Sequence, residues 1–158
     1  MAYKVFISHS TRDRGIVISL ARLLSQFGVE PYVASWYLTP GERIEDKVKQ
    51  QITGSDCVVV LLTQDGMRSS WVNQEIGCAI TAGKQIIPIV QKGTDPNCLG
   101  ALQGREYIEY DPREPQSALL TTSSYVGSLK LNKDEREKAL LVTGGILAFF
   151  LLLSEGEQ

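Results

Sequence analysis

The chain has 158 residues, of which 43% are hydrophobic and 22% are charged, and its formal net charge at pH 7 is −2. This balance is typical of a single globular domain, and it excludes disordered and collagen-like chains. A net charge so close to zero, with no basic stripe interleaved with aromatic residues, argues against a nucleic-acid partner.

Strand-like and helical patterns alternate along the chain. In chain order we expect a strand at 3–8, a helix at 16–27, a strand at 29–34, a helix at 44–54, a strand at 57–62, a helix from 69 or 70 to 82, strands at 85–90 and 106–110, and a helix at 118–129. Pro31 favours an edge position for the second strand. Residues 57–62 are continuously apolar, as in a strand buried on both faces of a parallel sheet. The link between the last two strands is expected to carry at most one helical turn.

This alternation predicts an α/β fold in which helices cover both faces of a parallel sheet. With five strands, we expect the flavodoxin-like, doubly wound strand order 2-1-3-4-5. The ligand crevice of such a sheet lies beyond the carboxyl ends of the first and third strands. Residues 8–14 and 63–71 are therefore expected to feed this crevice.

Four segments carry a resemblance to a known family. They are Val5-Phe6-Ile7-Ser8-His9-Ser10, Leu38-Thr39-Pro40-Gly41-Glu42, Ser70-Trp71-Val72-Asn73-Gln74-Glu75 and Lys84-Gln85-Ile86-Ile87-Pro88-Ile89. In this order and topology they resemble the sequence boxes of a TIR (Toll/interleukin-1 receptor) domain. The second segment corresponds to the BB loop of that family, and the third to its tryptophan- and glutamate-bearing helix. The resemblance implies that residues 1–131 form a TIR domain.

Two functions are implied by this resemblance. Some TIR domains assemble signalling complexes without chemistry, and others cleave NAD+ at the nicotinamide–ribose bond with a glutamate of the third helix. Glu75 falls on that position, which favours an NAD+ glycohydrolase, with ADP-ribose cyclisation as an alternative outcome. NAD+ is then a substrate, and no cofactor or metal is expected. Such an enzyme is activated by self-assembly and serves as a defence or stress effector, for example against phage. The alternative is a signalling scaffold acting through homotypic TIR–TIR contacts.

One carboxylate is chemically sufficient for this reaction. Glycosidases use a second carboxyl group to protonate the leaving oxygen, but nicotinamide is already a cation in NAD+ and departs neutral. On an ideal helix Glu75 lies beside Trp71 and between two faces. The expected core stripe is Val72, Ile76, Ala79 and Ile80, and the expected solvent face is Gln74, Gly77 and Thr81. Burial would raise the pKa of Glu75 and the helix dipole would lower it, while a surface ion pair is the non-catalytic alternative.

Seven further residues are candidates for substrate binding: Ser8, His9, Ser10, Arg12, Arg14, Tyr32 and Trp71. His9 is expected to line the pocket, with a general-base role as the alternative. Arg12 and Arg14 suit the two phosphates, or else they are solvated residues at a helix start. The resemblance implies that Tyr32 stacks on a base, whereas Trp71 is equally suited to packing.

The BB loop is expected to be an assembly surface and secondarily a lid, because exposed aromatic residues favour contact surfaces. Its interface candidates are Trp36, Tyr37, Leu38, Pro40 and Gly41. The expected partner is a second copy of the chain.

The C-terminal segment is surplus to the five-stranded fold. We expect a charged connector at 132–138, an apolar helix at 139–153 and a tail at 154–158. A helix over 139–153 covers only about 22 Å of a hydrocarbon core of about 30 Å. Its uniformly apolar character and the basic residues before it still favour a tail anchor with a cytosolic head. Packing on its own domain or on a second subunit is the alternative.

The cysteines bear on the compartment. Cys57, Cys78 and Cys98 are spaced like neither a metal site nor a redox pair. With no signal peptide before the first strand, they favour a cytoplasmic location.

Overall fold

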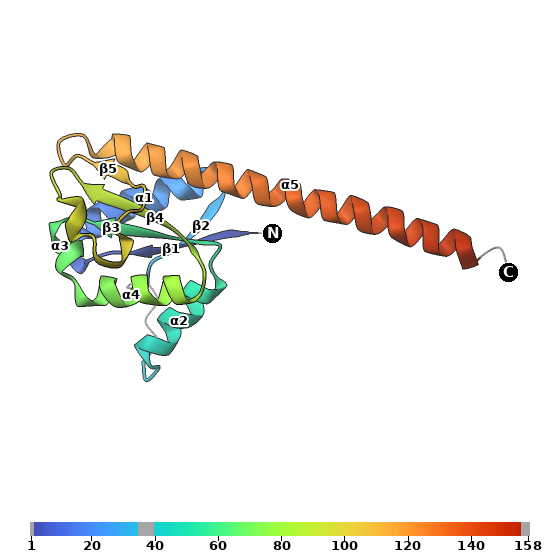
Figure 1. The fold of residues 1–158 in the computed structure, drawn as a ribbon, viewed down its shortest axis with the longest axis horizontal. Helices are drawn as coiled ribbons and strands as arrows, with labels where there is room; N and C mark the ends of the chain where they lie inside the picture. The colour runs from blue at the N-terminus through green and yellow to red at the C-terminus, as the bar shows by residue number, and fades with distance from the viewer. Residues whose placement is uncertain (1, 35–39, 156–158) are drawn as a thin grey trace.

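The computed structural model describes residues 2–34 and 40–155, with side chains described up to residue 142. Its five strands form one parallel sheet in the order β2-β1-β3-β4-β5, which confirms the expected order (Figure 1). The strands are β1 (Tyr3–Ser8), β2 (Val29–Tyr32), β3 (Cys57–Leu62), β4 (Gln85–Gln91) and β5 (Ile108–Tyr110).

Helices cover both faces of the sheet. They are α1 (Arg14–Gln26), α2 (Ile44–Gly54), α3 (Gln64–Arg68), α4 (Ser70–Thr81) and α5 (Pro115–Glu155), with 3-10 turns η1 (Thr11–Asp13), η3 (Pro96–Cys98) and η4 (Gly100–Leu102). Apolar residues of α1 and α5 form the core on one face, and those of α2 and α4 form the core on the other. The predicted doubly wound α/β fold is confirmed.

The central strand β3 belongs to both cores. Cys57, Val59 and Leu61 pack with α1 and α5, whereas Val58, Val60 and Leu62 pack with α2 and α4. All six residues are buried because β1 and β4 pair with its two edges and helices cover its two faces. Burial of each such aliphatic side chain stabilises the folded state by about 1.5–3 kcal/mol. The continuously apolar run was therefore a correct indicator of a doubly covered strand.

Several expected boundaries were wrong. β2 ends at Tyr32 rather than at 34, and β5 starts at Ile108 rather than at 106 because it pairs only with the last three residues of β4. The link before β5 contains two 3-10 turns rather than at most one helical turn. Ile44, the first residue of α2, is 62% exposed.

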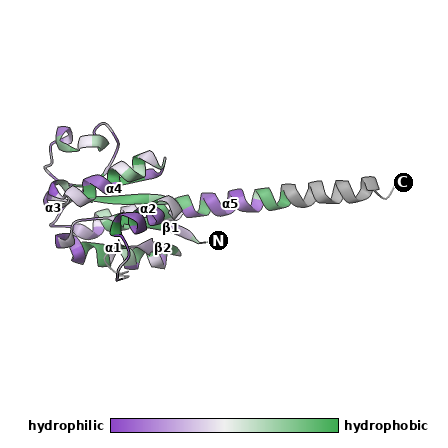
Figure 2. Ribbon diagram, turned by 90° about the horizontal axis from the view of Figure 1, so that it is seen from below, coloured by the Kyte–Doolittle hydropathy of each residue, from purple (hydrophilic) through white to green (hydrophobic). Residues whose placement is uncertain are grey.

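The final helix, α5, is longer than expected. It runs for 41 residues from Pro115 to Glu155, so the helix at 118–129, the connector at 132–138 and the apolar segment are one continuous helix. Figure 1 shows it extending well beyond the sheet, and Figure 2 shows polar residues followed by apolar residues where it leaves the domain. Within the described part of the chain, no helix is both long and apolar enough to cross a membrane. The tail anchor expected at 139–153 stays a prediction, because the side chains after residue 142 lie outside the described part of the chain.

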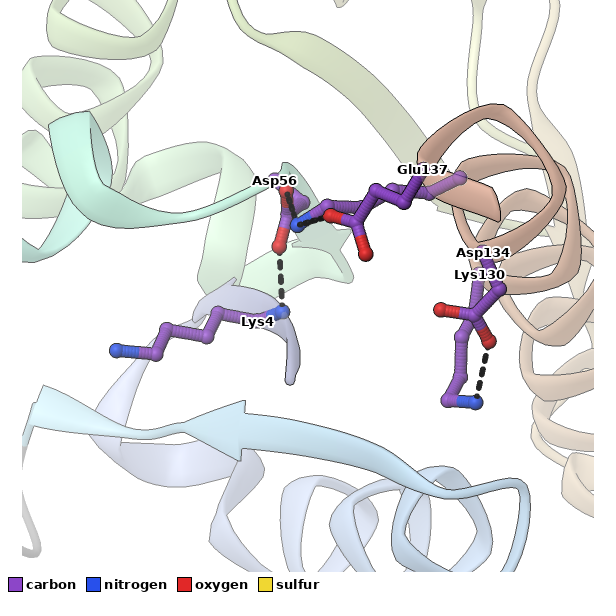
Figure 3. A network of polar contacts seen from close by, with 6 residues as sticks. Lys4, Asp56, Lys130, Asp134 and Glu137 are labelled. Carbon is purple, nitrogen blue, oxygen red and sulfur yellow. Dashed lines mark hydrogen bonds and ion pairs between the residues drawn. The ribbon is translucent and has the colours of Figure 1, made fainter. Parts of the chain in front are cut away.

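A polar network connects α5 to the amino-terminal ends of strands β1 and β3 (Figure 3). Lys133 Nζ lies 2.8 Å from Asp56 Oδ1, and the backbone N–H of Lys4 donates to Asp56 Oδ2 at 2.8 Å. The hydrogen bond to Asp56 raises the pKa of Lys133, whose Nζ also lies 5.8 Å from the centroid of the Tyr3 ring. Contacts between α5 and the rest of the domain thus continue past residue 131, and the helix is not interrupted there. The domain boundary expected at residue 131 stays a prediction.

Candidate active site

A pocket of about 350 Å³ lies between α2 and α4 and includes Glu75. Its described lining consists of Glu45, Val48, Lys49, Trp71, Gln74, Glu75 and Cys78. The lining residues of each helix are spaced three or four residues apart, which places them on one face of that helix. The α2 face and the α4 face therefore meet across the pocket. Another hollow, of about 300 Å³, lies against β4, β5 and α5, but the acid in its described lining, Glu106, is exposed. A pocket with a buried carboxyl group is the stronger candidate for chemistry.

Local structure places Glu75 in the interior. Ser69 caps α4 by accepting a hydrogen bond from the backbone N–H of Val72 at 3.2 Å. From this start, Val72, Ile76 and Ala79 are buried as expected, and Glu75 is only 4% exposed. Ile80, expected in the same stripe, is instead 38% exposed. Glu75 is therefore a buried carboxyl group on the α2 side of α4, and the surface ion-pair alternative is wrong.

Burial decides the protonation of Glu75. It raises the pKa of this carboxyl from an ordinary 4.5 to about 7, and hydrogen bonds from Ser8 and Trp71 oppose part of the rise. Ser8 is fully buried at the end of β1, and its Oγ donates to Glu75 Oε2. Near neutral pH the group is therefore present in both acid and carboxylate forms. The expected rise in the pKa through burial is therefore confirmed.

Asp13, which the sequence did not single out, joins the loop after β1 to the loop after β3. Thr63 Oγ1 donates to Asp13 Oδ2 at 2.5 Å and accepts from the backbone N–H of Gly66 at 3.0 Å. A Cβ at Gly66 would lie 2.2 Å from the carbonyl oxygen of Leu61, so only glycine fits this turn. Burial also raises the pKa of Asp13. This pair connects the loop after β1 with the loop after β3, and it was invisible in the sequence because the partners are 50 residues apart.

The residues of the first loop have different environments. Ser8 contacts Glu75, whereas Ser10 caps the η1 turn by accepting from the backbone N–H of Arg12 at 3.3 Å. His9 Nδ1 lies 3.3 Å from the carbonyl oxygen of Ile7, and burial lowers the pKa of the imidazole. His9 is not in the described lining of the Glu75 pocket, so its expected role as pocket lining stays a prediction.

Of the seven candidates, Trp71 is in the described lining of the pocket, and Arg12, Arg14 and Tyr32 are absent from it, as are Ser8, His9 and Ser10. Arg12 Nη1 lies 3.7 Å from Asp65 Oδ1, and the Arg12 side chain is 79% exposed. Arg14 is exposed at the start of α1. The Tyr32 ring stacks on Phe6 with centroids 5.7 Å apart. Contacts of these residues with a substrate stay predictions.

The structure also adds residues to the site. Glu45, Lys49, Gln74 and Cys78 line the pocket although the sequence did not single them out as ligand contacts. The sequence carried one indication of this role, because Glu45 and Lys49 are a polar pair at positions i and i+4 on either side of Val48. The apolar stripe of α2 made this pair easy to overlook. Among the described residues, no group of three or more His, Cys, Asp or Glu is placed to hold a metal ion.

The assembly surface is described only in part. Trp36, Tyr37 and Leu38 lie outside the described residues. Pro40 and Gly41 are exposed, and Gly41 has a φ of 85°, a conformation that favours glycine. The interface assigned to this loop stays a prediction.

Comparisons with known proteins bear on the family and the fold of the chain. A family model described as TIR domain matches residues 5–123. The 2' cyclic ADP-D-ribose synthase AbTIR of Acinetobacter baumannii is 27% identical over 77% of this chain, and the probable 2' cyclic ADP-D-ribose synthase TcpO of Methanobrevibacter olleyae is 28% identical over 46% of it. These matches cover 44% and 22% of the two relatives' own lengths. The TIR domain of the Toll-related receptor TRR-2 from Hydra magnipapillata has a TM-score of 0.62 at 22% identity, covers 85% of this chain and is itself covered over 99% of its length, which shows a shared fold.

Proposed function

The chain belongs to the TIR domain family, and we propose that it is an NAD+ glycohydrolase with Glu75 as its catalytic carboxylate. The observation that carries the proposal is a buried carboxyl group, held by Ser8 and beside Trp71, that lines a pocket between α2 and α4. The names of the two curated relatives support chemistry on ADP-ribose. NAD+ depletion by such an enzyme suits a defence or stress effector.

The proposed reaction needs one negative group beside the ribose. The bond between ribose C1′ and the nicotinamide nitrogen breaks, its electron pair leaves with nicotinamide, and positive charge remains on the sugar. The Glu75 carboxylate stabilises this charge, and Ser8 fixes its orientation through Oε2. The oxygen of water, or a hydroxyl of the substrate itself, then bonds to C1′ and releases its proton to solvent water. Water gives linear ADP-ribose and the internal hydroxyl gives a cyclic product, so the assay should follow both.

Activity is expected to depend on pH through Glu75. Because the ionised form is the active one and the pKa of this carboxyl is about 7, kcat/KM for nicotinamide release should rise with pH and level off above neutrality. Below that pKa it should fall about tenfold per pH unit. Chromatographic measurement of nicotinamide from about pH 5.5 to about pH 8.5 tests this. A profile that is flat across neutrality, in protein that stays folded, would contradict the assignment.

We also propose that self-association raises the activity. The family resemblance supports this, together with the exposed turn at Pro40 and Gly41, which leads into the helix carrying Glu45 and Lys49. Specific activity should increase with protein concentration in parallel with the average mass measured by light scattering. Constant specific activity across a dilution series that dissociates the protein would exclude this form of activation. A pure signalling scaffold would release no nicotinamide at any concentration.

A further inference from the structure

Lys49 is the one cationic residue in the described lining of the Glu75 pocket. It follows Glu45 by one turn on α2, and both residues line the pocket opposite α4. The other charged residues in this lining are Glu45 and Glu75, both acids. A ligand carrying phosphate groups would therefore meet two carboxyl groups, and Lys49 is the residue there that attracts it.

The side chain of Lys49 is also available. Among the residues that the structure describes, no ion pair includes Lys49. Its neighbour Lys47 lies with Nζ 4.0 Å from Glu42 Oε2, and Arg12 is paired with Asp65. An exposed ammonium group on a flexible stem offers three hydrogen-bond donors to a phosphate.

We propose that Lys49 binds the diphosphate of the dinucleotide, so that the pocket prefers phosphorylated nicotinamide ribosides over unphosphorylated ones. This inference rests on the proposed cleavage of NAD+ at Glu75. It assigns to α2 the contact that sequence reasoning gave to Arg12 and Arg14. Glu45, one turn away, opposes the same contact and limits its strength.

Lys49 acts on binding and not on the bond that breaks. The diphosphate carries the same charge in the substrate and in the transition state, so a contact to it lowers KM and leaves kcat nearly unchanged. The contact is also absent for nicotinamide riboside, which has the same scissile bond but no phosphate. These two properties separate a phosphate-binding residue from one that supports the fold.

The experiment compares Lys49→Gln, Glu45→Gln and the control Lys138→Gln, which removes a cation from the exposed part of α5. Binding of ADP-ribose and of adenosine is measured by calorimetry, and steady-state kinetics use NAD+ and nicotinamide riboside. Lys49→Gln should weaken ADP-ribose binding and raise the KM for NAD+ about tenfold, as expected for one charge-assisted contact. Adenosine binding and nicotinamide riboside kinetics should not change. Glu45→Gln should lower the KM for NAD+ about twofold or more, and Lys138→Gln should match the original chain.

The outcomes separate this inference from the proposed function. Unchanged ADP-ribose binding in Lys49→Gln, or an equal loss of adenosine binding, would overturn the role of Lys49. Absence of ADP-ribose binding to the original chain would overturn it as well. If the original chain binds ADP-ribose through Lys49 but releases no nicotinamide from NAD+, the phosphate site stands and the proposed enzyme does not.

Discussion

Glu75→Gln is expected to lower nicotinamide release from NAD+ by about 100- to 1,000-fold, the usual effect of removing one group that stabilises transition-state charge. The amide keeps the size of the carboxyl group and can still accept a hydrogen bond from Ser8 Oγ. It carries no negative charge at any pH, so it cannot stabilise the cation on the ribose. The measurement is nicotinamide release under saturating NAD+, with folding checked by circular dichroism.

Two further variants define the comparison. Glu75→Ala should lose at least as much activity, and it should also destabilise the protein at low pH by about 1–3 kcal/mol because the buried Ser8 hydroxyl loses its partner. Glu109→Gln removes a carboxyl group from an exposed position on β5 and should retain full activity. If Glu75→Gln is folded and still cleaves NAD+ within about tenfold of the original rate, the carboxylate is not the catalytic group.

The same Glu75→Gln substitution should stabilise the folded protein above neutral pH. The pKa of Glu75 is about 7 in the folded state and near 4.5 in the unfolded chain, so the folded state holds more protons between these values. Stability contributed by this group therefore falls as pH rises from about 4.5 to about 7, and the loss totals about 3 kcal/mol. Glutamine does not ionise, so the Glu75→Gln protein does not undergo this loss of stability.

Urea unfolding at about pH 5 and about pH 8 measures this effect. The difference in unfolding free energy between Glu75→Gln and the original chain should grow by up to about 3 kcal/mol between the two conditions. The raised pKa of Asp13 gives a pH dependence of the same sign, but it is present in both proteins and cancels in the difference. A difference that stays constant with pH would show that Glu75 titrates near its ordinary value in the folded protein.

Together the two results would show an exchange of stability for activity at one side chain. Burial makes the Glu75 carboxylate unfavourable in the resting protein, and the same poorly solvated surroundings strengthen its attraction for a cation on the ribose. A substitution that stabilises the protein while abolishing turnover is a frequent property of active-site residues.

The fold was largely predictable from local patterns. The continuously apolar segment 57–62 indicated the doubly buried strand β3, and the alternation of elements predicted the strand order. Helical spacing placed Glu75 beside Trp71 and next to the core stripe, as the structure has it. Such patterns suffice because hydrophobic periodicity is a property of each element alone.

The tertiary structure decided what depends on contacts between distant segments. It determined that Glu75 is buried deeply enough for its pKa to rise, that Asp13 meets Thr63, and that Lys49 of α2 lines the pocket. It also joined the last helix and the segment after it into one helix, α5. The degree of burial of a carboxyl group and the identity of its partners are set by how crossover connections bring loops together. The hydrophobic periodicity of a single helix or strand does not encode how far apart distant segments of the chain lie in the folded protein.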